Sequence, residues 1–427
     1  MRRMAVAGTA LAALSAAANM VSPLYPTYQQ LLGMSDLTMT ALYATFAATA
    51  LPALLLFGPA ADAVGRRPAL AASLVCAFAG TLLFALGGTT GTLFLGRVLL
   101  GIGLGTGTGA GIAMMVEASP ARRPMSGSTL ATLAFVGGSG AGPLMAGIVG
   151  QYAADPTTTP FLVMLGLLAT VYLLVLTLGR GTPVVRQRWR PTRPSVPAAM
   201  KHSFAIAALT GFVGWAVVGI FLALLPSLVD GFGAASNLAV SGAVVGALLT
   251  CSALSQLGAP RLEPRAAQTI GLTALAIGMA VLVGSHLPLF SGAPALVMTA
   301  VAAVLSGCGH GLSYWGAATE VDALTPEGCR AGVTASLYLS FYAGAGAPAV
   351  VVGLLSLGTP LISAILLVSM GLSLCIIVLL PVPSLVQTPV LSRPVPPLPR
   401  RADAVGTGDP GTGSAVAAAP AAAGLGR

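Results

Sequence analysis

The chain has 427 residues, of which 56% are hydrophobic and only 7% are charged. Soluble proteins carry about 25% charged residues, so this composition excludes a water-soluble fold and indicates an all-α polytopic membrane protein. Long continuous apolar runs also argue against a membrane β-barrel, whose strands alternate in polarity. The net charge of +9 does not indicate nucleic-acid binding, because the basic residues fall in loops on one predicted side of the membrane.

Twelve apolar runs are each of bilayer length, which takes about 20 residues. Twelve spans put both termini on one side. With the N-terminus inside, nearly all arginines are cytoplasmic, which is the expected bias. The other side then carries Asp36, Asp155, Asp230 and His286. The predicted runs are residues 4–32, 37–57, 69–87, 93–115, 126–150, 160–178, 204–228, 238–257, 267–285, 293–318, 331–355 and 360–380.

The runs form two sets of six, which we predict to be two helical bundles. The predicted units are an N-terminal bundle over 1–179, a cytoplasmic linker over 180–202, a C-terminal bundle over 203–381 and a tail over 382–427. The tail has little to bury, so we expect it to be disordered. The five cysteines show no metal-like spacing, and we expect no metal site, no cofactor and no catalytic cluster.

An internal repeat supports this division. In the first half a glycine run at 105–109 is followed by Glu117, and in the second half a glycine run at 307–311 is followed by Glu320. A proline and then a Gly-Pro or Gly-Ala-Pro sequence follow in both halves. The two series lie about half the chain apart, as expected of transporters built from parallel repeats.

The short link between the second and third runs carries the most specific pattern in the chain. Its residues Gly58, Asp62, Gly65, Arg66 and Arg67 resemble the signature loop of the major facilitator superfamily. The resemblance implies twelve helices in two pseudo-symmetric six-helix bundles, which move by alternating access. The corresponding loop of the second half, 258–265, keeps its charges but loses the glycine–aspartate frame.

The same resemblance implies a conformational latch on the cytoplasmic side. Glu117 would pair with an arginine of the signature loop, either Arg66 or Arg67, and Asp62 would dock on the start of the run at 331–355. Gly58 and Gly65 complete the loop. Such contacts form in one state of a two-state transporter and break in the other.

Proton coupling has three candidate residues. Arg97 is the one basic residue inside a span, and with Gly101 it resembles the family motif linked to proton coupling. The alternative is that Arg97 extends to the outer surface. An acid within the first span, which many drug antiporters have, is missing here, so Asp36 and His310 are the other candidates. His310 faces either the cavity or a packed, neutral surrounding.

The fifth run contains Gly138, Gly142, Pro143 and Gly147. Small residues allow close helix packing, and proline allows a bend. This pattern resembles the antiporter motif of the drug:proton antiporter branch, although Ala146 replaces a usual glycine. It is the main reason to prefer efflux over uptake.

Polar and aromatic residues within the spans are candidates for a central substrate cavity. We name Asn19, Tyr25, Trp215 and Tyr314. The alternative is that the aromatic residues belong to the belts at the membrane surfaces.

Together these patterns predict a secondary active transporter of the plasma membrane, with cytoplasmic termini, that exports small amphipathic molecules in exchange for protons. Its partners would be the substrate, protons and the lipid bilayer, with no nucleic acid, and we expect a monomer. Uptake or facilitated diffusion of a small metabolite, such as a sugar or an organic acid, is the alternative. A polytopic membrane enzyme is a distant third, because no clustered acid–base or metal group is present.

Overall fold

The computed structural model describes residues 1–119, 127–179, 189–230, 237–326 and 328–385, excluding the side chains of Asp62, Ser128, Asp230, Ser384 and Leu385. Twelve spans in these ranges are long and apolar enough to cross a membrane, as predicted. The helices are α1 (Arg2–Asn19), η1 (Ser22–Leu24), α2 (Tyr25–Leu32), α3 (Asp36–Phe57), α4 (Ala60–Val64), α5 (Arg66–Leu86), α6 (Thr90–Glu117), α7 (Gly127–Tyr152), α8 (Thr159–Leu176), η2 (Ala198–Met200), α9 (Lys201–Asp230), α10 (Leu238–Gly258), η3 (Ala259–Arg261), α11 (Pro264–Gly284), α12 (Ala293–Leu324), α13 (Arg330–Leu355), α14 (Leu361–Leu379) and α15 (Val382–Leu385).

The first span differs from its prediction as one continuous run. Helix α1 ends at Asn19, and a 3-10 turn leads into α2. Pro23 and Pro26 follow this break, and proline has no N–H with which to continue a helix. The first span is therefore a broken helix, which leaves backbone carbonyl groups near its middle without their usual partners.

Local signals explain where other helices begin and end. The side chains of Ser35, Thr89 and Asn237 each accept a hydrogen bond from the backbone N–H three residues later, which caps α3, α6 and α10. Gly65 has φ of 102° at the junction of α4 and α5. This conformation strains residues with a Cβ atom, which accounts for the second glycine of the signature loop.

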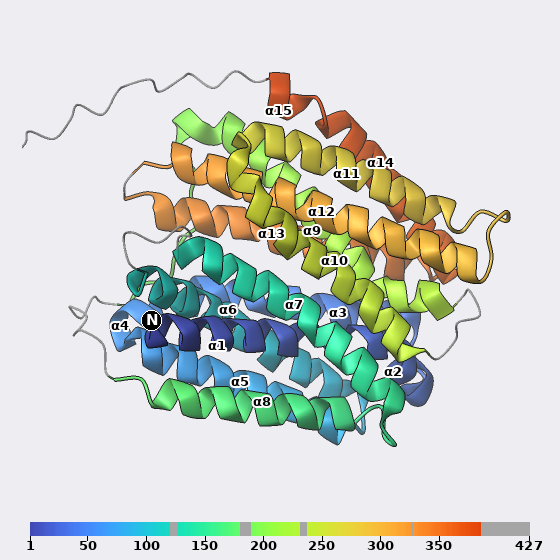
Figure 1. Ribbon diagram of the computed structural model, residues 1–427, viewed down its shortest axis with the longest axis horizontal. Helices are drawn as coiled ribbons and strands as arrows, with labels where there is room; N and C mark the ends of the chain where they lie inside the picture. Colours follow the sequence, from blue (N-terminus) through green and yellow to red (C-terminus); the bar gives the residue numbers. More distant parts are fainter. Residues whose placement is uncertain (120–126, 180–188, 231–236, 327, 386–427) are drawn as a thin grey trace, which may run out of the picture. The chain divides into compact units, whose positions relative to one another are not determined.

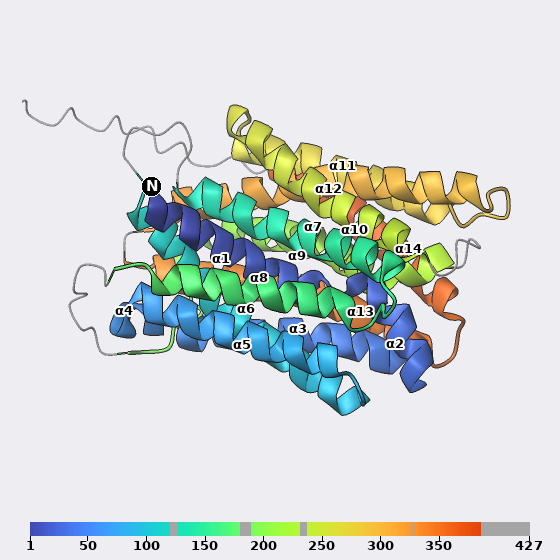
Figure 2. The same ribbon diagram turned by 60° about the horizontal axis from the view of Figure 1, so that its bottom comes forward.

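The helices pack as two halves within one compact unit, Met1–Gln387. Helices α1 to α8 form the first half and α9 to α14 the second (Figures 1 and 2). The N-terminus, α4 and linker residues 189–197 lie at one end of the helices, at the left in Figure 1, which we call the linker side. The opposite end is called the far side.

Two glycine-rich seams join the halves. Along α7 and α10, a Cβ atom on Gly140 would lie 3.1 Å from the carbonyl oxygen of Gly246, and one on Gly147 would lie 2.9 Å from the Cα atom of Gly242. Along α3 and α13, a Cβ atom on Gly353 would lie 3.1 Å from the Cα atom of Leu37. Such close backbone approach is typical of helices that associate in membranes.

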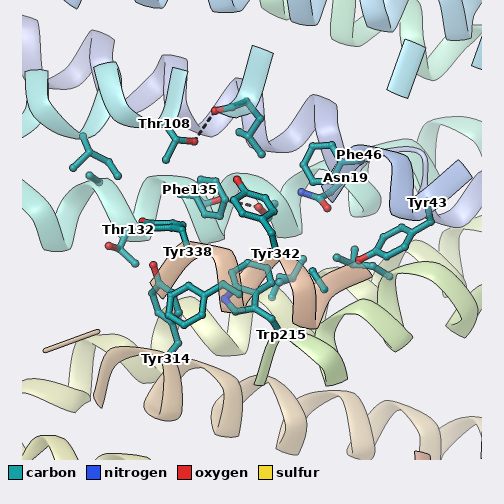
Figure 3. A pocket seen from close by; sticks show the side chains of 18 residues that line it. Asn19, Tyr43, Phe46, Thr108, Thr132, Phe135, Trp215, Tyr314, Tyr338 and Tyr342 are labelled. Atoms are coloured by element: carbon teal, nitrogen blue, oxygen red, sulfur yellow. Dashed lines mark hydrogen bonds between the residues drawn. The ribbon is translucent and has the colours of Figure 1, made fainter. Parts of the chain in front are cut away.

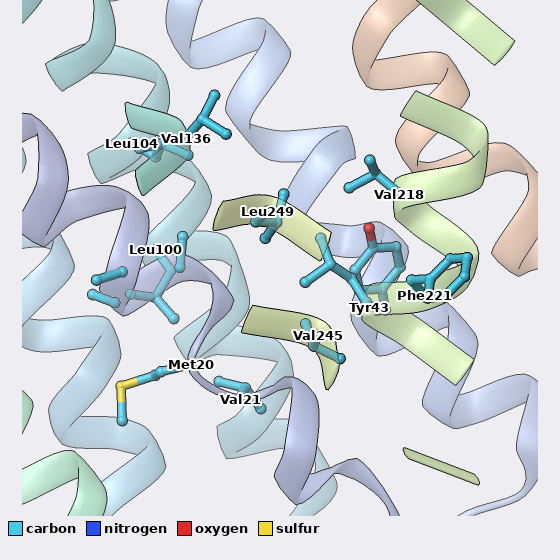
Figure 4. Packing of buried hydrophobic residues seen from close by; sticks show 14 of the residues in the cluster. Met20, Val21, Tyr43, Leu100, Leu104, Val136, Val218, Phe221, Val245 and Leu249 are labelled. Carbon is cyan, nitrogen blue, oxygen red and sulfur yellow. The ribbon is translucent and has the colours of Figure 1, made fainter. Parts of the chain in front are cut away.

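The core is continuous across the two halves. Figure 4 shows side chains of α3, α6 and α7 packed with side chains of α9 and α10. On the far side, Ser22 donates its hydroxyl hydrogen to the carbonyl oxygen of Leu222, and the backbone N–H of Leu238 donates to Gln151 Oε1 at 2.7 Å. The far side is therefore closed by direct contacts between the halves.

The linker contacts both halves on its own side. Trp189 Nε1 donates to the carbonyl oxygen of Leu56 at 2.8 Å. The backbone N–H of Thr192 donates to the carbonyl oxygen of Leu55 at 2.9 Å. The N–H of Ser195 donates to the carbonyl oxygen of Gly332, near the start of α13, at 3.1 Å. The predicted linker over 180–202 thus includes a described stretch that bridges α3 and α13.

Two helical segments extend beyond the predicted boundaries. Helix α12 continues to Leu324, beyond the predicted end at 318, because Glu320 and Asp322 there form ion pairs. The predicted tail over 382–427 begins with α15, and residues 386–427 lie outside the described part.

Candidate substrate-binding cavity

A central cavity lies between the two halves, with about 730 Å³ of empty space when its open side is included. Eighteen residues line it, from four helices of each half. They are Asn19, Tyr43, Phe46, Leu104, Thr108, Ile112, Ala131, Thr132, Phe135 and Ser139 from the first half, and Trp215, Leu222, Leu249, Tyr314, Tyr338, Phe341, Tyr342 and Ala345 from the second.

The cavity extends from the middle of the helices toward the linker side. Thr108 and Ile112 lie in the second half of α6, which ends on the linker side at Glu117. Ala131 and Thr132 lie near the start of α7, on the same side. Because direct contacts close the far side, the arrangement resembles one state of a carrier whose site is reached from one side at a time.

Among the described residues, the lining contains no charged side chain and many aromatic ones. Figure 3 shows Tyr314, Tyr338 and Tyr342 with Trp215 on the second-half side of the cavity. Phe341 packs against Tyr314 with ring centroids 5.2 Å apart, and against Tyr338 at 5.7 Å. Such a surface offers apolar contact, ring stacking and a few hydroxyl groups, which suits amphipathic ligands.

One amide and one indole N–H group provide directional polar contacts. Asn19 Nδ2 donates to the carbonyl oxygen of Ser15 at 2.9 Å, in the last turn of α1. Trp215 Nε1 is buried and has no hydrogen-bond partner among the described residues. A buried donor without a partner is costly, so a bound acceptor at this position would be favoured.

His310 lies behind the cavity wall rather than in it. Its Nδ1 atom is 2.7 Å from Ser252 Oγ, and its ring contacts Trp215 at 4.8 Å between centroids and Tyr314 at 5.8 Å. The side chain is fully buried, and Nε2 has no partner within the described ranges. His310 is thus one side chain away from any ligand in the cavity.

Arg97 is 2% exposed and does not reach the surface. Its Nη1 atom donates to the carbonyl oxygen of Ala18 at 2.6 Å, at the broken end of α1. Its guanidinium carbon lies 5.2 Å from the ring centroid of Tyr25, 5.8 Å from that of Phe46 and 5.9 Å from that of Phe84. Tyr25 is therefore part of the surroundings of Arg97 and is not among the cavity-lining residues, whereas Asn19, Trp215 and Tyr314 are.

Asp36 lies on the far side, where it accepts a hydrogen bond of 2.6 Å from Gln29 Nε2. No hydrogen bond or ion pair between described residues joins Asp36, Arg97 and His310 to one another. The three coupling candidates therefore occupy three separate places.

The signature loop is partly described. Arg66 Nε and Glu117 Oε1 form an ion pair of 3.1 Å, with side chains 23% and 59% exposed. Arg67 donates instead to the carbonyl oxygens of Val175 and Leu176, at 3.2 and 2.5 Å. Gly58 follows α3 with helical backbone angles. The docking partner predicted for Asp62 concerns a side chain outside the described part.

The second half contains an ion pair that the sequence analysis did not identify. Arg265 donates twice to Glu320 Oε1, at 3.0 Å each, and Gln268 Nε2 donates to Glu320 Oε2 at 2.6 Å. The repeat that relates Glu117 to Glu320 was the available signal. The degraded loop at 258–265 still supplies the arginine, so the pair of the first half recurs here with its carboxylate buried.

The glycines near Pro143 lie in two different helix contacts, one with α1 and one with α10. Cβ atoms on Gly138 and Gly142 would lie 2.6 and 2.9 Å from the Cα atoms of Ala12 and Ala16 in α1. Gly147 instead packs on α10 of the other half. The motif therefore fits α7 tightly between its own half and the second half.

These features define a multi-pass membrane transporter, with a cavity between two six-helix halves. The chain belongs to the major facilitator superfamily, whose sequence profile, described as Major Facilitator Superfamily, matches residues 7–349. It is a secondary transporter of a small molecule, not an enzyme.

Two solved structures show the same fold. A crystal structure of the nucleoside transporter NupG is 13% identical with a TM-score of 0.68, and the match covers 90% of this chain and 99% of that one. A POT family transporter in complex with 5-aminolevulinic acid is 13% identical with a TM-score of 0.67, covering 88% and 94%. At this identity the likeness concerns the fold alone. Comparison with curated protein sequences finds no match.

Proposed function

We propose that the chain exports small amphipathic molecules across the plasma membrane in exchange for protons, with its linker side in the cytoplasm. The observation that carries this proposal is the cavity itself: it is shared by both halves, and its lining, as far as the structure describes it, has many aromatic rings and no charged side chain.

The direction of transport is inferred from α7. Gly138, Gly142, Pro143 and Gly147 follow the pattern of the drug:proton antiporter branch, and the close packing of α7 on α1 and α10 gives these residues a physical role. A stiff seam between the halves would limit leakage of protons through the interface while the halves move.

His310 is the residue we assign to proton exchange. It is buried, it contacts the cavity-lining rings of Trp215 and Tyr314, and its Nε2 atom has no partner within the described structure. A cation in this apolar surrounding is costly, so substrate binding next to Trp215 would disfavour the protonated ring and release the proton. Asp36 lies on the far side and suits a role at the exit.

The latch on the linker side completes the cycle. Arg66 and Glu117 are already paired, and their exposure allows water to replace the pair when the halves move. Asp62 would join this cluster in the state whose cavity opens to the far side. A few kcal/mol of contact that differs between states is enough to set their populations.

The test uses everted membrane vesicles whose interior is more acidic than the medium, so that protons leaving the vesicle can drive dye uptake. Adding the neutral amphipathic dye N-phenyl-1-naphthylamine should dissipate the gradient in vesicles with the wild-type chain and not in those with His310→Asn. A matched control is Gly166→Ala, because a Cβ atom at Gly166 has nothing within 4 Å and this variant should behave as wild type. Dye accumulation without any proton movement would contradict antiport and favour facilitated diffusion.

A further inference from the structure

Arg97 brings a buried positive charge that no carboxylate balances. Its side chain is 2% exposed, and no acidic group pairs with it among the described residues, whose ion pairs join Arg66 with Glu117, Arg265 with Glu320 and Arg330 with Asp322. The guanidinium group keeps its proton in proteins. A charge in such a place is expensive unless it has a function.

The groups around Arg97 compensate only part of this charge. The carbonyl oxygen of Ala18 accepts one hydrogen bond at 2.6 Å, at the C-terminal end of α1, and a helix C-terminus is equivalent to about half a negative charge. The rings of Tyr25, Phe46 and Phe84 add cation–π attraction but no net charge. The Nε atom of Arg97 has no partner in the described residues. A net positive potential therefore remains.

Two residues connect the surroundings of Arg97 with the cavity, so the cavity lies within range of this potential. Phe46 contacts the guanidinium group with one side of its ring and also lines the cavity (Figure 3). Asn19, which follows the hydrogen-bonded Ala18, lines the cavity as well. None of the lining residues in the described part of the chain carries a negative charge that would offset Arg97.

We propose that Arg97 makes the cavity selective for charge, so that it accepts neutral and carboxylate-bearing amphipathic molecules and disfavours permanent cations. This inference rests on the proposed function only in placing the substrate within this cavity. It applies to either direction of transport, because the field of a fixed charge acts on a bound ligand however the ligand arrived.

The size of the effect follows from distance. A ligand atom in contact with the cavity side of Phe46 would lie roughly 9 Å from the guanidinium group. At an effective dielectric constant of about 20, with half the charge offset, the interaction changes affinity by about fivefold per unit charge. A carboxylate should gain this factor and a quaternary ammonium should lose it. Ligands of opposite charge should thus differ by about twentyfold.

The experiment compares three ligands with the same ring system: 2-naphthamide, 2-naphthoate and (2-naphthylmethyl)trimethylammonium. Binding is measured by equilibrium dialysis against the full chain in phosphatidylcholine nanodiscs, with empty nanodiscs subtracted. For the wild type we expect naphthoate to bind at least tenfold tighter than the ammonium compound. Arg97→Gln should reduce this ratio at least tenfold and leave naphthamide affinity within about twofold, and Arg97→Lys should keep most of the ratio.

A second variant tests the path of the field in case Arg97→Gln does not fold. Phe46→Ala removes the ring between the guanidinium group and the cavity, so the ratio of naphthoate to naphthamide affinity should rise severalfold even if both bind more weakly. Phe341→Ala is the matched control, because it removes an apolar lining ring of the second half and should weaken all three ligands alike.

Three outcomes would overturn the proposal. Equal binding of the naphthoate and ammonium compounds to the wild type, or an unchanged ratio in Arg97→Gln, would refute charge selectivity and leave the assignment of the cavity intact. Failure of all three ligands to bind the wild type would refute the cavity as the substrate site as well, and the proposed function with it.

Discussion

The seam between α7 and α10 permits a quantitative prediction. A Cβ atom on Gly147 would lie 2.9 Å from the Cα atom and 3.2 Å from the nitrogen of Gly242, and it would collide with the carbonyl oxygen of Leu238. All three are backbone atoms, so the collision is relieved only if the helices separate. Overpacking of this kind costs about 1–3 kcal/mol.

Gly137 provides the matched control on the same helix, because a Cβ atom there has nothing within 4 Å. Gly→Ala raises helix propensity by about 1 kcal/mol wherever it is made, so this gain cancels when the two variants are compared. Gly147→Ala should therefore be less stable than Gly137→Ala by about 1–3 kcal/mol.

The measurement is unfolding of each purified variant by sodium dodecyl sulfate in mixed micelles, followed by circular dichroism. Transport of N-phenyl-1-naphthylamine in vesicles adds a functional readout, which should fall for Gly147→Ala and stay at the wild-type level for Gly137→Ala. Equal stability of the two variants would show that the seam is loose enough to accept a methyl group, and the close-packing argument would be refuted.

Three further predictions concern charged and titratable groups. Asp62→Asn should abolish transport at near-normal expression, and wild-type transport rates would refute its place in the latch. Glu320→Gln should cost about 1–3 kcal/mol of stability because it leaves the part-buried Arg265 without its charge partner, whereas Glu117→Gln should cost at most about 1 kcal/mol. Unfolding measurements that rank the two in the opposite order would contradict this. His310→Asn should retain ligand binding in dialysis and lose proton exchange in vesicles, so unchanged proton exchange would exclude His310 as the exchanging residue.

The fold could be predicted well because one physical term dominates it. A membrane span must bury about 20 apolar residues and satisfy its own backbone, so hydropathy alone locates helices. The break after Asn19 was missed because hydropathy does not report backbone hydrogen bonding. Pro23 and Pro26 were the available signal, since two prolines three residues apart leave two missing donors within one turn.

The cavity was harder to predict. When a membrane helix is apolar on all sides, hydropathy does not indicate which side faces the cavity. Asn19, Trp215 and Tyr314 were proposed from residue type, and all three line the cavity. Tyr25 has the same chemistry but lies against Arg97, which no periodicity could have shown. Other lining residues were not identified, although Tyr338, Phe341 and Tyr342 are spaced to share one face of α13.

The two ion pairs of the repeat suggest different roles for the two halves, with one pair that can break during transport and one that stays formed. Glu320 is 7% exposed and accepts three hydrogen bonds, so separating it from Arg265 would leave a buried charge and a strong penalty. Glu117 is 59% exposed, and water can replace Arg66 at little cost. Contacts that must form and break in each cycle need a small energy difference between states, or one state becomes a trap. The pair of the first half meets that requirement, and the pair of the second half suits a permanent support for α11 and α12.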